Sequence, residues 1–285
     1  MMHGYIPPHR FLPYLSWTEI DALPDRENTV IVLPVGAIEQ HGPHLPCAVD
    51  SVISAGVLGR ALAKLPDAVR AFGLAPLTYG KSDEHLHFPG TMTLAGPTLL
   101  AVVQEVGESV YRAGFRKLLL ANGHGGQPQV LEMAARELRL RHGDFVVVPF
   151  HVSRLPNASG KYVSDQEKKL AMHAGHAETA LMLALAPDTV RMDRAAPNIP
   201  PVFPSKLLSP DGRPACAWTA RDFGPSGVIG DPTGATREQG VEILETLSGS
   251  WVQAITDLFQ MQWLVRDARS WGHAHQQGHI ETASG

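Results

Sequence analysis

Histidine and carboxylate side chains are the groups in this sequence with the most capacity for chemistry, because the chain has 14 histidines but only two cysteines, Cys47 and Cys216. Two cysteines are too few for a disulfide framework, a cysteine zinc site or an iron–sulfur cluster. Glu39 and His41 lie two residues apart, so in an extended loop their side chains project to the same side. Asp50 can join them if the proline-containing loop folds back, which would give the oxygen and nitrogen ligands of a divalent cation. For this segment alone, the alternative that Glu39 caps a turn and His41 is a hydrogen-bonded loop residue stays open.

A glycine-rich segment, residues 122–127, contains the next candidate, His124. Its glycines let the backbone turn sharply and approach a ligand closely. A loop of this kind before a helix could instead bind phosphate. The segment lacks the Lys and Ser/Thr of a P-loop and the third Gly of the dinucleotide fingerprint, so we expect His124 to be the functional group.

The third candidate segment contains His173, His176 and Glu178 at the start of an expected helix. These three side chains cannot all share one helix face, although His173 and His176 could do so if His173 already lies in the helix. Apolar residues flank Glu178, and a buried carboxylate is costly unless it is paired or bound to metal. The alternative is an exposed first-turn Glu that the helix dipole favours.

Other polar residues have less specific roles. His85 and His87, with Glu84, lie in a loop that could either reach the site or only hold its own turn, and no role is assigned to His176. Asp231 is expected to form an Asx turn.

The pattern of elements predicts where the three candidate segments meet. Valine-, isoleucine- and leucine-rich stretches alternate with helical patterns, which is typical of βαβ units in an α/β fold with a mainly parallel sheet. Ligands of such folds collect at the carboxyl ends of the strands. We expect strands over residues 29–35, 71–77, 116–121 and 145–149, and helices over 52–64, 98–113, 128–142, 171–186 and 236–263.

Length and composition bound the remaining possibilities. The chain has 285 residues, of which 44% are hydrophobic, and no linker divides it, so we expect one domain over residues 1–269 and a disordered tail over 270–285. The net charge of −4 gives no basic footprint for nucleic acid. No apolar run approaches a membrane span and no signal peptide is evident, so we expect a cytoplasmic protein without a membrane partner.

The ordered motifs resemble the creatininase (creatinine amidohydrolase) family, over about residues 32–240. This resemblance implies a three-layer α/β/α fold and a site with two divalent ions, which we expect to be zinc, manganese or iron. It also implies hydrolysis of the C–N bond of a small-molecule amide, and an oligomeric assembly, often a hexamer. The motifs are Gly36-Ala-Ile-Glu-Gln-His-Gly-Pro-His-Leu-Pro46 with Asp50, Glu84-His85 before Phe88-Pro-Gly-Thr91, Asn122-Gly-His-Gly-Gly126, His173-Ala-Gly175 with Glu178-Thr179, and Gly230-Asp-Pro232.

Carried over residue by residue, the resemblance implies that Glu39, Asp50 and His124 hold one ion. His41, Asp50 and Glu178 hold the other, with Asp50 as the bridge. His173 matches an active-site histidine beside the substrate, and the expected catalytic residues are His173 and Glu178.

One departure bears on the substrate. Creatininase proper has an acidic residue at the position of Gly126, so Glu178 must supply the missing carboxylate. Residues 153–169 also lack the tryptophans that enclose creatinine. The sequence is similar to branches that deformylate a formamidopyrimidine nucleotide or cut a cofactor-precursor peptide. It also leaves open a creatinine amidohydrolase proper and a catalytically silent relative that binds a metal or a metabolite.

The expected reaction begins with attack of a metal-activated hydroxide on the amide carbonyl. His173 would deliver a proton to the leaving nitrogen as a general acid. Acyl-enzyme chemistry is disfavoured because the sequence has no G-x-S-x-G motif.

Overall fold

The computed structural model describes residues 1–201, 205, 207–210 and 214–262, and it alternates strands with helices through its first half. The expected order of strand, loop and helix is confirmed, with shifts at several ends. In chain order, the elements are α1 (Trp17–Asp21), β1 (Val30–Val35), α2 (Val49–Lys64), β2 (Ala71–Gly73), α3 (Gly96–Arg112), β3 (Lys117–Asn122), α4 (Pro128–Arg141), β4 (Val146–His151), α5 (Asp165–Leu170), α6 (His176–Leu185) and α7 (Arg237–Gln260).

The four strands form one parallel sheet in the order β2-β1-β3-β4. Val35 at the end of β1 pairs with Asn122 at the end of β3, and Asn122 pairs with His151 at the end of β4. The loops that leave these strands therefore start side by side at one edge of the sheet. The candidate segments after β1 and β3 are thus neighbours although they are about 80 residues apart in sequence.

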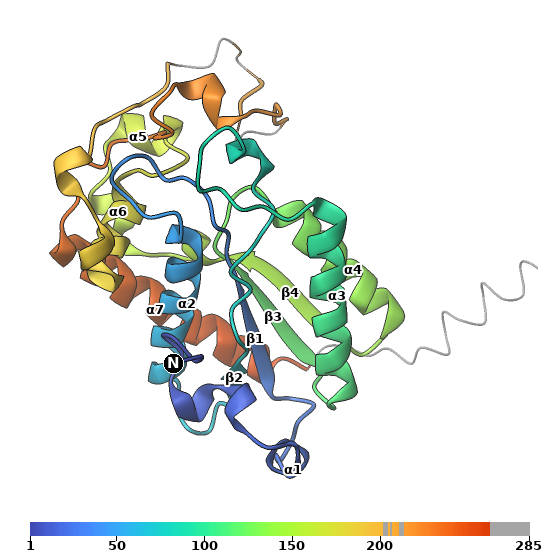
Figure 1. Cartoon of the computed structure of the whole chain (residues 1–285). Helices are drawn as coiled ribbons and strands as arrows, with labels where there is room; N and C mark the ends of the chain where they lie inside the picture. Colours follow the sequence, from blue (N-terminus) through green and yellow to red (C-terminus); the bar gives the residue numbers. More distant parts are fainter. Residues whose placement is uncertain (202–204, 206, 211–213, 263–285) are drawn as a thin grey trace, which may run out of the picture.

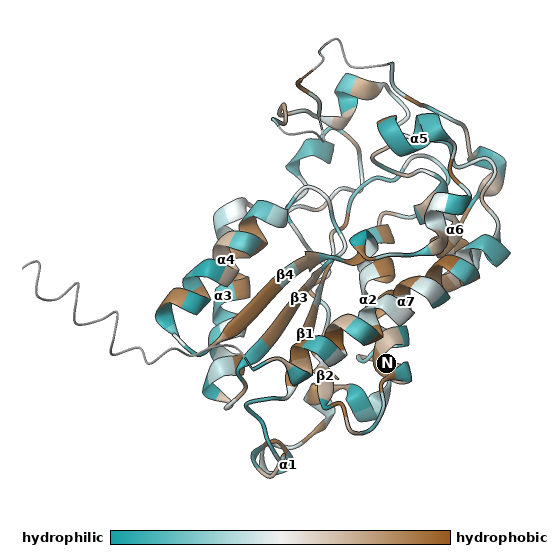
Figure 2. Cartoon of the chain, turned by 180° about the vertical axis from the view of Figure 1, so that it is seen from behind, coloured by the Kyte–Doolittle hydropathy of each residue, from teal (hydrophilic) through white to brown (hydrophobic). Residues whose placement is uncertain are grey.

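Helices cover both faces of the sheet, which confirms the expected three-layer α/β/α fold (Figure 1). Successive residues of β1 point to opposite faces, as the strand period requires. Val30 and Val32 pack into the core with α2, α6 and α7, whereas Ile31 and Leu33 pack into the core with α3 and α4. Because both faces are buried, the strands are hydrophobic along their length (Figure 2).

Two elements differ from the sequence prediction. The strand expected over 71–77 is only Ala71–Gly73, and Pro76, which cannot donate a ladder hydrogen bond, lies beyond its end. The helix expected over 171–186 begins at His176 instead, because Ala174 adopts a left-handed conformation with φ of 54° that a helix cannot continue. His173 pairs with Ile229 in an isolated antiparallel bridge, so it shares no helix face with His176.

The segments beyond the sheet complete the fold. The polar stretch before α6 contains the short helix α5, which Ser164 caps by accepting a hydrogen bond from Glu167 N. Asp231 Oδ1 accepts hydrogen bonds from Thr233, which confirms the expected Asx turn. No helix within the described ranges is both long and apolar enough to cross a bilayer. The tail expected over 270–285 lies outside the described residues.

Candidate metal centre

Three chain segments bring the candidate residues to the carboxyl edge of the sheet. The loop after β1 carries Glu39 and His41, and it leads directly into α2, whose first turn holds Asp50. The loop after β3 brings His124 onto this turn. Gly123 makes the approach possible, because a Cβ there would clash with the backbone oxygen of Asp50.

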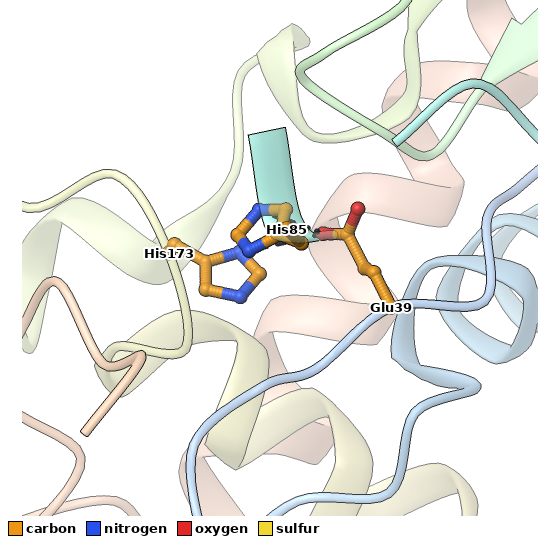
Figure 3. A group of neighbouring side chains, drawn as sticks. All are labelled: Glu39, His85 and His173. Atoms are coloured by element: carbon orange, nitrogen blue, oxygen red, sulfur yellow. Dashed lines mark ion pairs between the residues drawn. The ribbon is translucent and has the colours of Figure 1, made fainter. Parts of the chain in front are cut away.

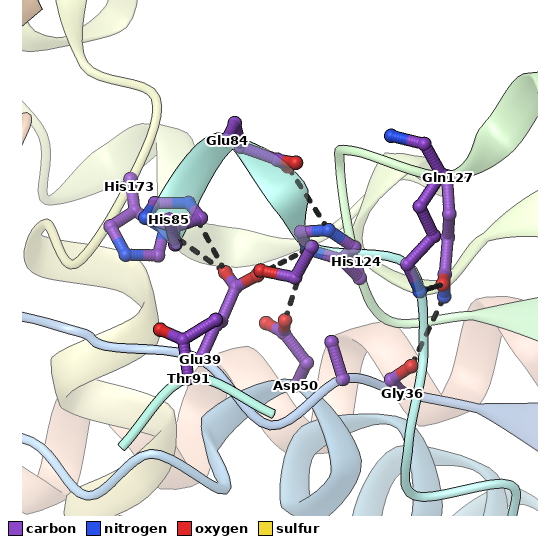
Figure 4. Close-up of polar contacts among 12 residues, drawn as sticks. Gly36, Glu39, Asp50, Glu84, His85, Thr91, His124, Gln127 and His173 are labelled. Carbon is purple, nitrogen blue, oxygen red and sulfur yellow. Dashed lines mark hydrogen bonds and ion pairs between the residues drawn. The ribbon is translucent and has the colours of Figure 1, made fainter. Parts of the chain in front are cut away.

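Glu39, Asp50 and His124 form a compact buried cluster (Figure 4). Nδ1 of His124 lies 3.1 Å from Oε2 of Glu39 and 3.1 Å from Oδ2 of Asp50. On the other side of Asp50, its Oδ1 lies 3.4 Å from Nε2 of His41, and this nitrogen is 3.8 Å from Oε1 of Glu39. Asp50 therefore lies between the two candidate histidines.

His41 also belongs to a second group of potential ligands, with His173 and Glu178, whose donor atoms lie within 4.8 Å of one another. The chain before α6 and the first turn of α6 supply the last two residues. The backbone N–H of Ala174 donates a 2.6 Å hydrogen bond to Oε2 of Glu178, which fixes this carboxylate beside the turn. Glu178 is therefore not an exposed first-turn residue that only the helix dipole favours.

The orientation of the His173 ring is set by the backbone. Its Nε2–H donates to the carbonyl oxygen of Gln40 at 2.7 Å, which leaves Nδ1 free of a proton in the neutral ring. Nδ1 lies 3.5 Å from Oε1 of Glu39, and the ring packs against His85 (Figure 3). It also packs against His41. The free nitrogen thus faces the cluster.

Two residues of the loop before α3, for which the sequence left the role open, also reach the site. Nε2 of His85 lies 3.6 Å from Oε1 of Glu39, and its Nδ1 accepts a 2.8 Å hydrogen bond from the side-chain amide of Gln40. Oε1 of Glu84 lies 3.1 Å from Nε2 of His124. The adjacent acid and imidazole in residues 82–91 were the available sequence signal, but nothing in the sequence fixes where that loop folds.

The other histidines near the motifs lie elsewhere. His87 is exposed. His176 is buried, and its Nε2 contacts Oε1 of Gln239 at 2.8 Å, so it connects the starts of α6 and α7.

Burial and close charges shift the ionisation of the cluster strongly. Burial opposes a charge on His41, yet Asp50, Glu178 and Glu39 together raise its pKa to about 9. Burial also opposes ionisation of Asp50, but His41 and His124 hold its pKa below the usual range. Burial raises the pKa of Glu178 to about 7. Burial and the nearby His41 lower the pKa of His173 well below its ordinary value, so this ring is neutral at neutral pH.

The donor atoms present fit a pair of divalent ions. His41 Nε2 and Asp50 Oδ2 are buried and make no hydrogen bond within the described residues, although polar groups of this kind are costly when unsatisfied. A carboxylate and imidazole set without thiolate suits zinc, manganese or iron. Among the described residues, four groups of three place donor atoms within 4.8 Å of one another, namely Glu39 with His41 and Asp50, Glu39 with Glu84 and His124, His41 with His173 and Glu178, and Glu39 with His85 and His173.

Two cavities are lined by residues of the site. The first, of about 290 Å³, is lined by His173, Glu178 and residues of α5 and α6. The second, of about 760 Å³, is lined by Glu84, Gly126, Arg154 and Trp218, among others. Although residues 153–169 contain no tryptophan, a segment much later in the chain thus brings one to the second cavity.

Comparison with known proteins identifies the family of this chain. The family model described as creatinine amidohydrolase matches residues 13–255. The creatinine amidohydrolase of Pseudomonas putida is 34% identical, with 89% of this chain and 97% of that protein covered. The mycofactocin precursor peptide peptidase of Mycobacterium ulcerans is also 34% identical, with 79% of this chain and 84% of that protein covered.

A solved structure supports the same family. A mutant creatininase of Zn–Zn type superimposes with a TM-score of 0.69 and 32% identity, covering 88% of this chain and 98% of the other. The fold and site therefore define a hydrolase of the α/β/α class. The chain belongs to the creatininase family.

Proposed function

We propose that this protein is a binuclear metal-dependent amidohydrolase that hydrolyses a C–N amide bond. The observation that carries the proposal is the convergence of carboxylate and imidazole groups on Asp50, from three separate segments of the chain. Membership of a family that includes an amidohydrolase and a peptidase supports this reaction class.

The two ions would be held on either side of Asp50. Glu39, Asp50 and His124 would hold one ion, and the short distances from His124 Nδ1 to both carboxylates support this set. His41, Asp50 and Glu178 would hold the other. The Zn–Zn type of the solved creatininase supports two ions, and the donor set would also accept manganese or iron.

Bound divalent ions would supply a water of lowered pKa and a polarised amide carbonyl. The chain itself provides proton transfer through His173, whose Nε2–H is held by the carbonyl oxygen of Gln40. Its Nδ1 can take a proton from the attacking water and deliver it to the leaving nitrogen. We propose Glu178 as both a ligand and a catalytic residue, because its carboxylate lies within 4.8 Å of donor atoms of His41 and His173.

The substrate would be a small-molecule or peptide amide larger than creatinine. The support for this size is the 760 Å³ cavity, whose lining includes Glu84 and Gly126. A formamide or a peptide amide fits this description better than a small flat ring. The family resemblance further suggests a homo-oligomer built from a single catalytic domain over residues 1–269.

Reconstitution tests this proposal. The purified protein is stripped with a chelator, reloaded with Zn²⁺, Mn²⁺ or Fe²⁺, and assayed against formamides, lactams and short peptides. We expect amide hydrolysis only after metal is restored, and none in Asp50→Asn. Full activity in the stripped protein would contradict metal dependence. No turnover of any amide at full metal loading would favour a silent metal-binding protein.

A further inference from the structure

Glu84 approaches the cluster from a side that none of the proposed ligands occupies. Glu84 lies in a 3-10 turn, Asp83–His85. Ser82 before this turn and His85 at its end both contact residues of the site. Ser82 Oγ donates to Oε2 of Glu39 at 2.5 Å, and His85 accepts from the amide of Gln40 at 2.8 Å. The position of the Glu84 carboxylate is therefore fixed by the same residues that build the site.

The Glu84 carboxylate occupies the space that a side chain at position 126 would fill. A Cβ added to Gly126 would overlap Oε1 of Glu84 and come close to Nε2 of His124. The backbone does not require glycine there, because Gly126 is not among the glycines with positive φ. Gly126 is thus needed for space rather than for conformation.

The contact with Glu84 bears on which nitrogen of the His124 ring is available to bind a metal ion. Oε1 of Glu84 lies 3.1 Å from Nε2 of His124, while Nδ1 of the same ring faces Glu39 and Asp50 at 3.1 Å each (Figure 4). If Nε2 carries the proton, the lone pair of Nδ1 meets two carboxylates. That arrangement is favourable only with a cation between them.

We infer that Glu84 is a positioning residue for His124, and that Gly126 leaves the space for its carboxylate. Nε2 of His124 is buried and makes no hydrogen bond within the described residues, although Glu84 lies 3.1 Å away. With a metal ion on Nδ1, Glu84 would accept the hydrogen bond from Nε2–H and so hold the ring in the orientation that binds the ion. A carboxylate behind a ligating histidine fixes its tautomer and raises its basicity. This inference deepens the proposed function and rests on the proposed metal centre.

Zn²⁺ affinity, measured by competition with a chromophoric chelator, tests the inference without an activity assay. Glu84→Ala should weaken the affinity by about 10- to 100-fold, the usual effect of removing a carboxylate of this kind. Glu84→Gln should lose less, because its amide oxygen still accepts from Nε2–H. The matched control is Asp83→Ala, which removes an acid of the same turn that pairs with Lys81 instead, and which should leave the affinity within about twofold.

A double-mutant cycle of Gly126→Ala and Glu84→Ala tests whether the two side chains compete for one space. The cycle does not depend on one variant folding well. Gly126→Ala should weaken Zn²⁺ binding in the wild-type background, because the new Cβ displaces Glu84. The same change in the Glu84→Ala background should have almost no further effect. Thermal melts of the metal-free variants check that each one is folded.

The outcomes separate this inference from the proposed function. Absence of tight Zn²⁺ binding in the wild-type protein would overturn both. Normal wild-type binding with equal affinities for Glu84→Ala and Asp83→Ala would overturn the role of Glu84 alone. An equal loss from Gly126→Ala in both backgrounds would contradict the claim that Glu84 and a side chain at position 126 compete for one space.

Discussion

Asp50 contacts both His41 and His124, and we propose it as the bridging ligand, whereas we propose His173 as the proton carrier. We predict that Asp50→Ala empties both metal positions. His173→Ala should keep most of the metal and chiefly lower kcat. Metal content of the two purified variants, measured by mass spectrometry, is the readout. Equal metal loss in both would show that His173 is a ligand.

His44 makes the predicted free energy of unfolding depend on pH. Burial and the neighbouring His41 lower the pKa of His44 to about 4, and its Nε2 contacts the Thr179 hydroxyl at 3.0 Å. The unfolded chain takes up a proton near pH 6.5, but the folded chain does not until about pH 4, so stability is lost as the pH falls through this window.

We therefore predict that His44→Gln reduces the acid sensitivity of folding. Between pH 6.5 and 4.5 the variant should lose about 2 kcal/mol less unfolding free energy than the wild type. Urea unfolding at several pH values measures this difference. The control His87→Gln, at an exposed histidine, should follow the wild type, and parallel curves for His44→Gln and wild type would contradict the assignment.

At the residue scale, the sequence identified candidate site residues where carboxylate and imidazole stand in a distinctive pattern. It did not identify residues whose place in the site depends on how a loop folds. Glu39, His41, His124 and Glu178 could be picked out because carboxylate and imidazole follow strand or helix ends. Glu84 and His85 could not be placed, since their loop is positioned by contacts of Ser82 and Gln40 that no local pattern encodes.

Among the elements, α6 and α7 approach each other closely at Gly240, where a Cβ would overlap the backbone oxygen of Ala180. We predict that Gly240→Ala destabilises the protein by about 1 to 3 kcal/mol, because two packed helices must move apart. Since α6 carries Glu178, metal affinity should also fall. Chemical denaturation of the metal-free protein measures the first effect.

Gly249 in the same helix supplies the matched control. Nothing lies within 4 Å of a Cβ built at this position. Gly249→Ala should therefore stabilise the protein by up to about 1 kcal/mol through helix propensity alone. Equal changes in unfolding free energy for Gly240→Ala and Gly249→Ala would contradict the predicted steric overlap between α6 and α7.

The types of helices and strands could be predicted from the sequence where the pattern of hydrophobic residues was clear. The Val-, Ile- and Leu-rich run of β1 and the helical spacing of α3 and α4 gave the correct types, with ends shifted by one or two residues. It was wrong at residues 171–175, where an apolar alanine-rich run favoured helix. The left-handed turn at Ala174 and the bridge of His173 to Ile229 are tertiary features that override that propensity.

For the whole molecule, the cavities lined by residues of the site predict the substrate preference. The 290 Å³ cavity contains His173 and Glu178 in its lining, and the 760 Å³ cavity is lined by Glu84 and Gly126, so we expect more room than creatinine fills. The described residues that line the 290 Å³ cavity include no Trp, Tyr or Phe, and the lack of such an aromatic contact costs about 0.5 to 1.5 kcal/mol. We expect kcat/KM for creatinine to be below about 10⁴ M⁻¹s⁻¹ and lower than that for a formamide or peptide amide. Steady-state kinetics decides this, and a higher value for creatinine would contradict it.

The central claim is that Asp50 bridges two metal ions, and anomalous diffraction from a crystal of the Zn²⁺-loaded protein tests it most directly. We expect two anomalous peaks about 3.5 Å apart. One should contact Glu39 and His124, the other His41 and Glu178, and Asp50 should contact both. A single peak at full loading, or two peaks that do not share Asp50, would contradict the account.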